Sequence, residues 1–122
     1  MRYLSKIQIE ELLNSNHGGE GLFRIWDEII NYFPNISYEE CKAEFLSLIE
    51  YLLTEKIIKL CGVWTDKENT WDGSIENILV LIKNWFPNET DWNFREDASF
   101  KMFDFDYPFI KWLKDAPIKL TI

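Results

Sequence analysis

His17 is the only histidine of the chain and the first side chain to consider for catalysis. An imidazole can act as a general base near neutral pH. No recognisable motif places a serine or cysteine nucleophile beside it, and the neighbouring Ser15 says nothing about geometry. We therefore expect His17 to be a solvated loop residue, and we expect that the chain is not an enzyme.

The loop around His17 is rich in glycine and precedes a predicted helix. It resembles a phosphate-binding loop only superficially, because it lacks a preceding strand, a lysine and the required glycine spacing. Glu20 would also oppose an anion bound at the start of that helix. We expect a flexible turn between two helices, and no nucleotide or other cofactor.

Metal ligands are weakly indicated. The two cysteines and the single histidine do not have the spacing of a zinc site. Asp66, Glu68 and Asp72 could offer oxygen atoms, but their segment lacks the glycine at the sixth position of a calcium loop. Paired carboxylates can hydrolyse glycosides, yet every acidic chain offers many such pairs. We expect no metal.

The stretch from Pro87 to Tyr107 indicates binding rather than catalysis, because carboxylates and aromatic rings are interleaved along it. Only Arg95 and Lys101 oppose its negative charge. Aromatic anchors supply contact energy, and a field of one sign steers an oppositely charged partner. The rings belong to Trp92, Phe94, Phe100, Phe103, Phe105 and Tyr107.

Two interpretations of this stretch remain open. In one, it docks a basic protein, with a second acidic cluster nearby. In the other, its rings face the core and its carboxylates form the solvated side of an edge strand, which the alternation from Phe103 to Tyr107 also fits. For the first interpretation, the predicted contact residues are Asp66, Glu68, Asp72, Glu89, Asp91, Trp92, Glu96, Asp97, Asp104 and Asp106.

The composition is that of a folded, acidic protein. The chain has 122 residues, a net charge of −8 and 47% hydrophobic residues, which suits one domain spanning residues 1–122. The negative charge argues against nucleic acid and against an anionic membrane surface. A basic protein is the natural complement, although an acidic balance also simply keeps a protein soluble.

The start of the chain runs directly into an amphipathic pattern and does not resemble a signal peptide. No apolar run reaches the length of about 18 residues that indicates a membrane span. We expect a cytoplasmic protein in which Cys41 and Cys61 are reduced and buried.

Four helices are predicted. Ser5 with Gln8 and Ser37 with Glu40 have the spacing of capping boxes, which mark helix starts. The third helix should bury its apolar side chains and leave its charged ones, Glu44 among them, mostly outside that face. The first should present Ile7, Ile9, Leu12 and Leu13 on an apolar stripe, and the others should cover residues 22–33, 38–54 and 75–86.

Strands are predicted mainly in the second half of the chain. Ile57–Leu60 should begin a strand that continues toward Trp64 and is followed by a polar turn from Thr65 to Gly73. Residues 100–105 look extended, and residues 108–113 and 117–122 should be strands joined by a hairpin turn. The predicted class is α+β, with about four helices packed on a small antiparallel sheet formed mainly by the C-terminal half.

Three blocks of the sequence resemble a known kind of protein. They are residues 45–59, residues 71–87 and residues 107–112, with their patterned hydrophobic residues and tryptophans. They resemble small acidic bacterial immunity proteins of contact-dependent growth inhibition and related polymorphic toxin systems, over about two thirds of the chain from Phe45 onward. The resemblance implies a cytoplasmic protein that binds and neutralises a cognate toxin, often a nuclease, without catalytic residues.

An alternative function stays open. The chain contains six tryptophans, and surface tryptophans favour self-association. The chain could then be a small homodimeric adaptor or regulatory domain. We expect a monomer or a weak homodimer, with no nucleic-acid or membrane partner.

Overall fold

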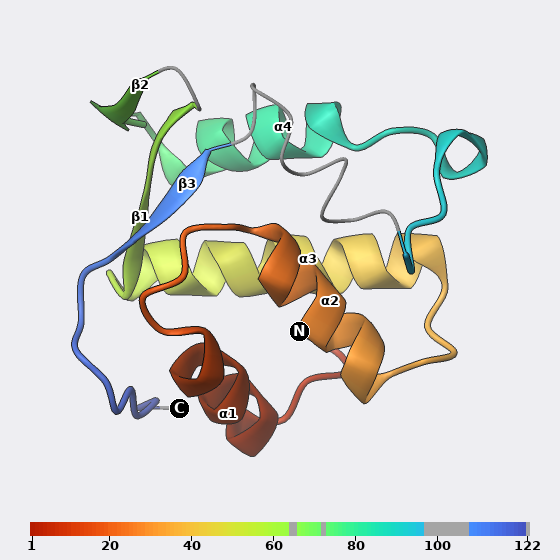
Figure 1. The fold of residues 1–122 in the computed structure, drawn as a ribbon, viewed down its shortest axis with the longest axis horizontal. Helices are drawn as coiled ribbons and strands as arrows, with labels where there is room; N and C mark the ends of the chain where they lie inside the picture. The colour runs from red at the N-terminus through yellow and green to blue at the C-terminus, as the bar shows by residue number, and fades with distance from the viewer. Residues whose placement is uncertain (64–65, 72, 97–107, 122) are drawn as a thin grey trace.

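A long central helix organises the molecule, with a small sheet near its C-terminal end. The computed structural model describes residues 1–63, 66–71, 73–96 and 108–121. In Figure 1, α3 runs through the middle, with α4 along one side and α1 and α2 on the other. The predicted α+β class is confirmed. The elements are α1 (Lys6–Asn16), α2 (Phe23–Tyr32), α3 (Tyr38–Thr54), β1 (Ile58–Val63), β2 (Asp66–Thr70), α4 (Ile75–Trp85), the short 3₁₀ helix η1 (Glu89–Asp91) and β3 (Phe109–Trp112).

Two helices begin where their capping residues predict. The Ser5 hydroxyl accepts a hydrogen bond from the backbone N–H of Gln8 at 3.2 Å, and the Gln8 side chain accepts one from the backbone N–H of Ser5 at 2.9 Å. Ser37 and Glu40 form the same reciprocal pair at the start of α3. Caps of this kind stabilise a helix by about 1 kcal/mol. The predicted stripe of α1 is wrong at Ile7, which lies off the buried face and is 69% exposed.

The core is built around α3, which packs against α2 and α4. Its buried side chains include Phe45, Leu48 and Leu52, as the helical pattern predicts. Burial of such side chains contributes about 1.5–3 kcal/mol each. One expectation for this helix is wrong. Glu44 is buried, with 2% exposure, because its carboxylate binds backbone groups from the start of the chain.

The sheet has the strand order β2-β1-β3, and both pairings are antiparallel. The strand predicted from Ile57 is confirmed as β1. The polar turn predicted from Thr65 to Gly73 is wrong for Asp66–Thr70, which forms β2. This segment has no apolar alternation, so its extended form depends on backbone pairing with β1 rather than on its own side chains.

The predicted C-terminal hairpin is also wrong. β3 forms, but residues 117–121 do not form a strand. The Asn14 side chain instead accepts a hydrogen bond from the backbone N–H of Ile118 at 2.6 Å and donates one to its carbonyl at 3.0 Å. Ile118 and Leu120 are buried, so their alternation reflects docking beside α1 rather than a sheet ladder.

Cys41 and Cys61 are both buried, as predicted. The extended segment predicted for residues 100–105 lies outside the described residues. Among the helices that the structure describes, none combines the length and the apolar character needed to cross a lipid bilayer.

Candidate functional site: an acidic surface over an aromatic cluster

A cluster of aromatic rings lies where the start of α3 meets the segment that follows α4. Trp26 of α2 is fully buried at its centre. The ring centroid of Trp26 lies 5.3 Å from that of Phe86, 5.6 Å from that of Trp92 and 6.2 Å from that of Phe94. Tyr38 and Phe45 of α3 complete what we call the aromatic cluster. Large rings in mutual contact provide a rigid base for the chain that covers them.

Hydrogen bonds fix the covering segment in place. The indole N–H of Trp26 donates to the carbonyl of Phe94 at 2.7 Å. The hydroxyl of Tyr38 donates to the carbonyl of Pro87 at 2.5 Å. The guanidinium group of Arg95 donates to two carbonyls of the loop between α2 and α3. Residues 86–96 are therefore tied at both ends to α2 and α3.

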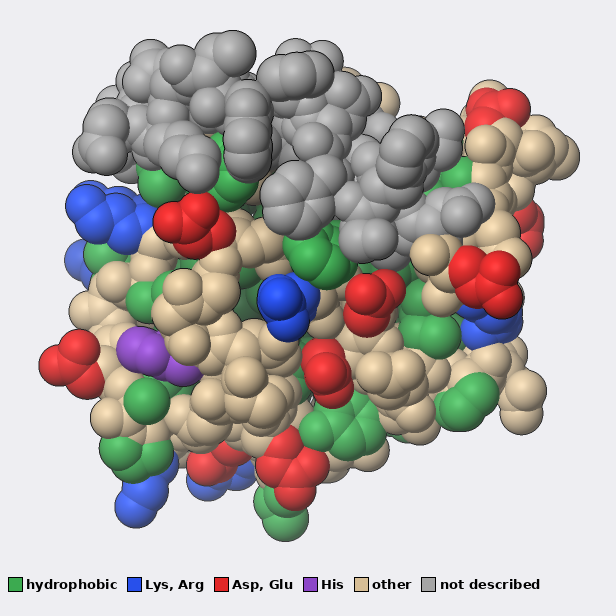
Figure 2. Space-filling view, viewed as in Figure 1, with side chains coloured by type: hydrophobic (Ala, Val, Ile, Leu, Met, Phe, Trp, Pro, Cys, Tyr) green, Lys and Arg blue, Asp and Glu red, His purple; other side chains and the backbone are tan. Residues whose placement is uncertain are grey.

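Exposed carboxylates surround this cluster, and we call them the acidic end. They are Glu39, Glu40, Glu89, Asp91 and Glu96. Glu39 and Glu40 begin α3, whereas Glu89 and Asp91 lie in η1. Figure 2 shows carboxylates over the part of the molecule that carries η1. Three of the predicted contact residues are thus brought together on one surface with two carboxylates from the start of α3.

The pKa of Tyr38 responds to a carboxylate at the start of α3 and to one in η1. Burial is the main cause that raises the pKa of Tyr38 to about 12, and Glu39 and Glu89 both raise the pKa further. A negative charge disfavours the ionisation of a nearby phenol only at short range in a screened medium. Glu39 and Glu89 therefore act on the same site, although they are 50 positions apart in the sequence.

Trp92 does not offer an exposed ring. Its side chain is 7% exposed and packs against Trp26 and Tyr38, whose centroids lie 5.6 Å and 5.8 Å away. The interpretation that places rings in the core holds for Trp92 and for Phe94, which is 8% exposed. The indole N–H of Trp92 lowers the pKa of Tyr38, but it lacks a hydrogen-bond partner of good geometry.

Two cations lie within the same region and offset part of its charge. The Lys42 ammonium lies 5.7 Å from the ring centroid of Tyr38 and 5.4 Å from that of Phe86. The Arg95 guanidinium lies 4.6 Å from the ring centroid of Phe94. Both cations rest on aromatic faces, which attract positive charge.

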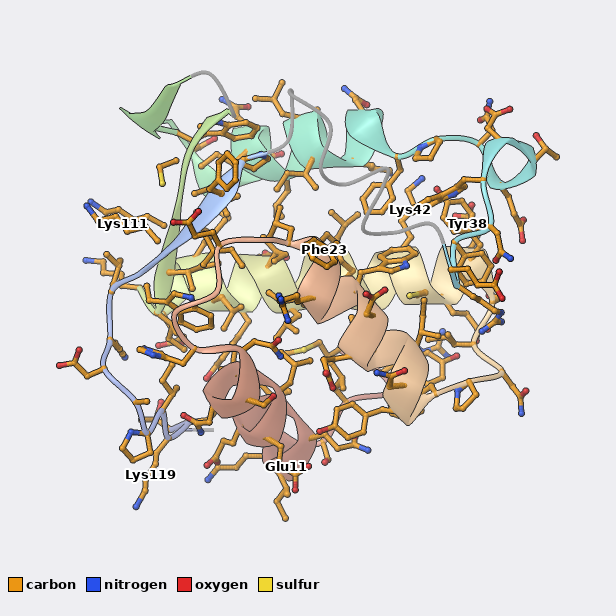
Figure 3. The ribbon with its side chains drawn as sticks, viewed as in Figure 1. Glu11, Phe23, Tyr38, Lys42, Lys111 and Lys119 are labelled. Carbon is orange, nitrogen blue, oxygen red and sulfur yellow. The ribbon has the colours of Figure 1, made fainter. Side chains whose placement is uncertain are left out.

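The opposite end of the molecule, which carries the sheet, presents lysines together with carboxylates. Lys59 of β1 and Lys111 of β3 are directly paired across the sheet, and both are exposed. Figure 3 shows Lys111 and Lys119 on the side of the molecule away from Tyr38 and Lys42. Lys56 and Lys114 flank the same strands, where Glu55 and Asp115 offset part of the charge. Glu20, whose carbonyl accepts a hydrogen bond from Ile110, is also exposed at this end, so both signs of charge are present among the described side chains there.

The N-terminal segment, residues 2–4, packs beside the acidic end. The Glu44 carboxylate accepts backbone hydrogen bonds from Arg2, Tyr3 and Leu4 at 2.8, 3.0 and 2.7 Å. The Tyr3 hydroxyl donates to Glu40, and this bond is the main cause that lowers the pKa of Glu40. A hollow of about 270 Å³ is lined here by Arg2, Tyr3, Glu39, Glu40 and Glu44, among others.

The remaining predicted contact residues are not brought to this surface by any described contact. Asp66 and Glu68 belong to β2, in the sheet. Asp72, Asp97, Asp104 and Asp106 lie outside the described residues.

His17 is more constrained than a solvated loop residue. Its Nε2–H donates to the carbonyl of Lys114 at 2.7 Å, and its ring lies 4.9 Å from that of Trp112. The Trp112 indole N–H donates to Gly19, and the backbone N–H of Ile110 donates to Glu20. The glycine-rich loop is therefore held against β3, and His17 has a structural role in holding it there.

Other sites for chemistry are poorly supported in the parts of the chain that the structure describes. There, no group of three or more histidine, cysteine, aspartate or glutamate side chains is placed to hold a metal ion. Burial raises the pKa of the Cys41 thiol to about 12. A thiolate, rather than a thiol, is the reactive form, so Cys41 is a core residue rather than a nucleophile.

Glu39 and Glu40 were not among the predicted contact residues. The signal that could have found them is the capping box, because it places the first turn of α3 at an exposed helix start. Their proximity to Glu89 depends on the tertiary contact between Tyr38 and Pro87, which no local pattern reveals.

Comparisons with known proteins identify no relative of this chain. No protein-family model matches the chain, and neither a curated protein nor a solved structure matches it.

Proposed function

We propose that this chain is a non-enzymatic binding protein whose acidic end docks a basic protein. In the more specific form of the proposal, it is a cytoplasmic immunity protein and the partner is a toxin domain, such as a nuclease. The acidic surface then occludes the site at which the toxin binds phosphate. The toxin form rests on the sequence resemblance, whereas the docking surface rests on the structure.

The observation that carries the proposal is a group of exposed carboxylates that two distant segments bring together. Glu39 begins α3, Glu89 and Asp91 lie in η1, and both Glu39 and Glu89 act on Tyr38. A partner with a basic face is attracted to such a group of like charges, which accelerates the encounter.

The aromatic cluster supports the proposal in a second way. Residues 86–96 are anchored by Trp26, Tyr38 and Arg95, so their carboxylates are held before the partner arrives. A preorganised surface loses less conformational entropy on binding. Because Trp92 is buried, contact energy at this surface comes from the carboxylates and the backbone around them.

The experiment compares three forms of the chain. One is the natural sequence, and the second is the triple variant Glu39→Gln, Glu89→Gln and Asp91→Asn. Glu40 and Glu96 are left unchanged because they bond to Ser37 and Asn93 within the fold. The third form changes three carboxylates elsewhere by the same chemistry and charge, and it carries Glu10→Gln, Glu55→Gln and Asp115→Asn.

Each form is immobilised and exposed to lysate of the producing organism, and the bound proteins are identified by mass spectrometry. The proposal expects one basic protein to bind the natural chain and the control but not the acidic-end variant. That protein, when purified, should be toxic or nucleolytic and should be neutralised by the natural chain. Equal capture by all three forms would contradict the docking surface, and a captured protein without toxic activity would contradict the immunity role.

The homodimeric alternative through surface tryptophans gains no support from the described side chains. Trp26 and Trp92 are buried, and Trp71 and Trp112 are partly buried.

A further inference from the structure

A groove between α3 and α4 leaves apolar side chains open to solvent. Its volume is about 490 Å³, and its apolar lining comes from Leu46, Ile75, Leu79 and Val80. Val80 is 51% exposed, and the neighbouring Leu81 is 48% exposed. Apolar side chains gathered in a groove that charged residues border are typical of a contact surface.

Charges are arranged along this groove in an ordered way. Glu50, Glu76 and Lys83 line it together with the apolar residues. In Figure 1, α3 and α4 run in opposite directions. Glu50, near the end of α3, and Glu76, near the start of α4, therefore lie toward one end of the groove. Lys83 lies toward the other end.

The exposed face of α4 is complementary in charge to a second copy of the same helix that runs in the opposite direction. Glu76 and Lys83 lie seven positions apart, and the midpoint between them falls between Leu79 and Val80. If a second α4 lies antiparallel to the first with its midpoint over this position, each Glu76 faces the other copy's Lys83. The aliphatic residues then meet at the centre, where a two-fold axis would pass.

We propose that α4 and the groove beside it form a two-fold interface with a second copy of this chain. A second copy is favoured over a partner of one charge sign because the groove has carboxylates at one end and a lysine at the other. An antiparallel α4 places the opposite charge at each of these ends. Glu50 adds a second carboxylate near the site of the incoming Lys83. This surface shares no residue with the acidic end.

The dimer is a weak one. α4 has 11 residues and is about 16 Å long, so one pair of such helices buries less than the roughly 1,200–2,000 Å² of a stable specific interface. Each copy also carries a net charge of −8, which repels the other at long range. Dissociation in the micromolar to millimolar range is therefore expected.

Sedimentation equilibrium of the full chain at physiological salt tests the proposal. We expect a reversible monomer–dimer equilibrium with dimer present at about 1 mM protein, the weak limit of specific association. Lys83→Glu or Glu76→Lys alone should raise the dissociation constant by about tenfold or more, because each creates two like-charge contacts across the axis. The double variant Glu76→Lys with Lys83→Glu restores both pairs but leaves Glu50 near the carboxylate introduced at position 83, so it should lower the dissociation constant by about threefold or more relative to either single variant without reaching the natural value.

Lys119→Glu is the matched control for Lys83→Glu, because it makes the same change in net charge at the far end of the molecule and should alter the dissociation constant by less than about twofold. Far-UV circular dichroism confirms that each variant is folded. A chain that stays monomeric at 1 mM would overturn the proposal. So would a dimer that the single variants leave intact, or one that the double variant does not strengthen relative to the single variants.

Discussion

The buried carboxylate of Glu44 gives the sharpest test of how the N-terminal segment is held. This side chain is 2% exposed and accepts backbone hydrogen bonds from Arg2, Tyr3 and Leu4 at 2.8, 3.0 and 2.7 Å. Oε2 accepts two of these bonds and Oε1 accepts the third. Replacing Glu44 with Gln keeps the size of the side chain but changes one oxygen into an amino group, which cannot accept.

The expected cost follows from these three bonds. A hydrogen bond to a charged group contributes about 1.5–3 kcal/mol and a neutral one about 0.5–1.5 kcal/mol, so Gln loses one bond and weakens two. Part of this loss is recovered because a buried charge is no longer desolvated. The net destabilisation should be about 2–4 kcal/mol, or a fall of about 8–15 °C in Tm for a domain of this size.

Urea unfolding followed by tryptophan fluorescence measures the difference, and hydrogen exchange at the amides of residues 2–4 localises it. Those amides should exchange faster in Glu44→Gln under conditions where the rest of the core stays protected. Glu50→Gln, on an exposed part of the same helix, is the control and should change stability by less than about 0.5 kcal/mol. A cost for Glu44→Gln as small as that of the control would refute the role assigned to Glu44.

Further predictions concern the aromatic cluster, the sheet and the histidine. Because the pKa of Tyr38 is raised to about 12, the folded protein resists its ionisation, so stability should be full below about pH 10 and fall by up to about 3 kcal/mol as the pH rises to about 12. Tyr38→Phe should remove this part of the alkaline loss in urea unfolding, and Glu89→Gln should lower the pKa of Tyr38 in an ultraviolet titration; an unchanged pKa would contradict the position of Glu89. Lys111→Glu should stabilise the fold by about 0.2–1 kcal/mol, since Lys59 and Lys111 are like charges directly opposite each other; an equal or lower midpoint in urea would count against that pairing. His17→Ala should leave binding to the captured partner unchanged, and loss of that binding in a variant that stays folded would contradict a purely structural role for His17.

Features with local causes were predictable from the sequence. Ser5 and Ser37 form their capping boxes with residues three positions away, so both helix starts were correct. The buried face of α3 follows from a period of 3.6 residues, which needs no information from the rest of the chain.

Features that depend on distant partners were not predictable in this way. Glu44 is a charged residue on a helix, and only the N-terminal amides 40 or more positions away explain its burial. β2 is polar and becomes a strand only because β1 lies beside it. Residues 118–120 alternate as a strand would, but Asn14 binds the segment beside α1.

At the candidate site, too, locally determined features were predictable and features that depend on distant contacts were not. The acidic character of Glu89, Asp91 and Glu96 was evident from the sequence, and all three are exposed. The burial of Trp92 and the proximity of Glu39 were not evident, because both depend on how the segment after α4 folds back onto Tyr38. An aromatic residue among carboxylates therefore does not by itself show whether its ring faces a partner or the core.

The most direct test of the acidic end is the rate at which it associates with the captured basic partner, measured by stopped-flow fluorescence at low and high salt. The natural chain and the control variant with Glu10, Glu55 and Asp115 neutralised should associate fast at low salt and slow down by about tenfold or more at high salt. The variant with Glu39, Glu89 and Asp91 neutralised should associate slowly at both. Equal rates for all three proteins, or a rate that does not respond to salt, would contradict the claim that these carboxylates steer the partner.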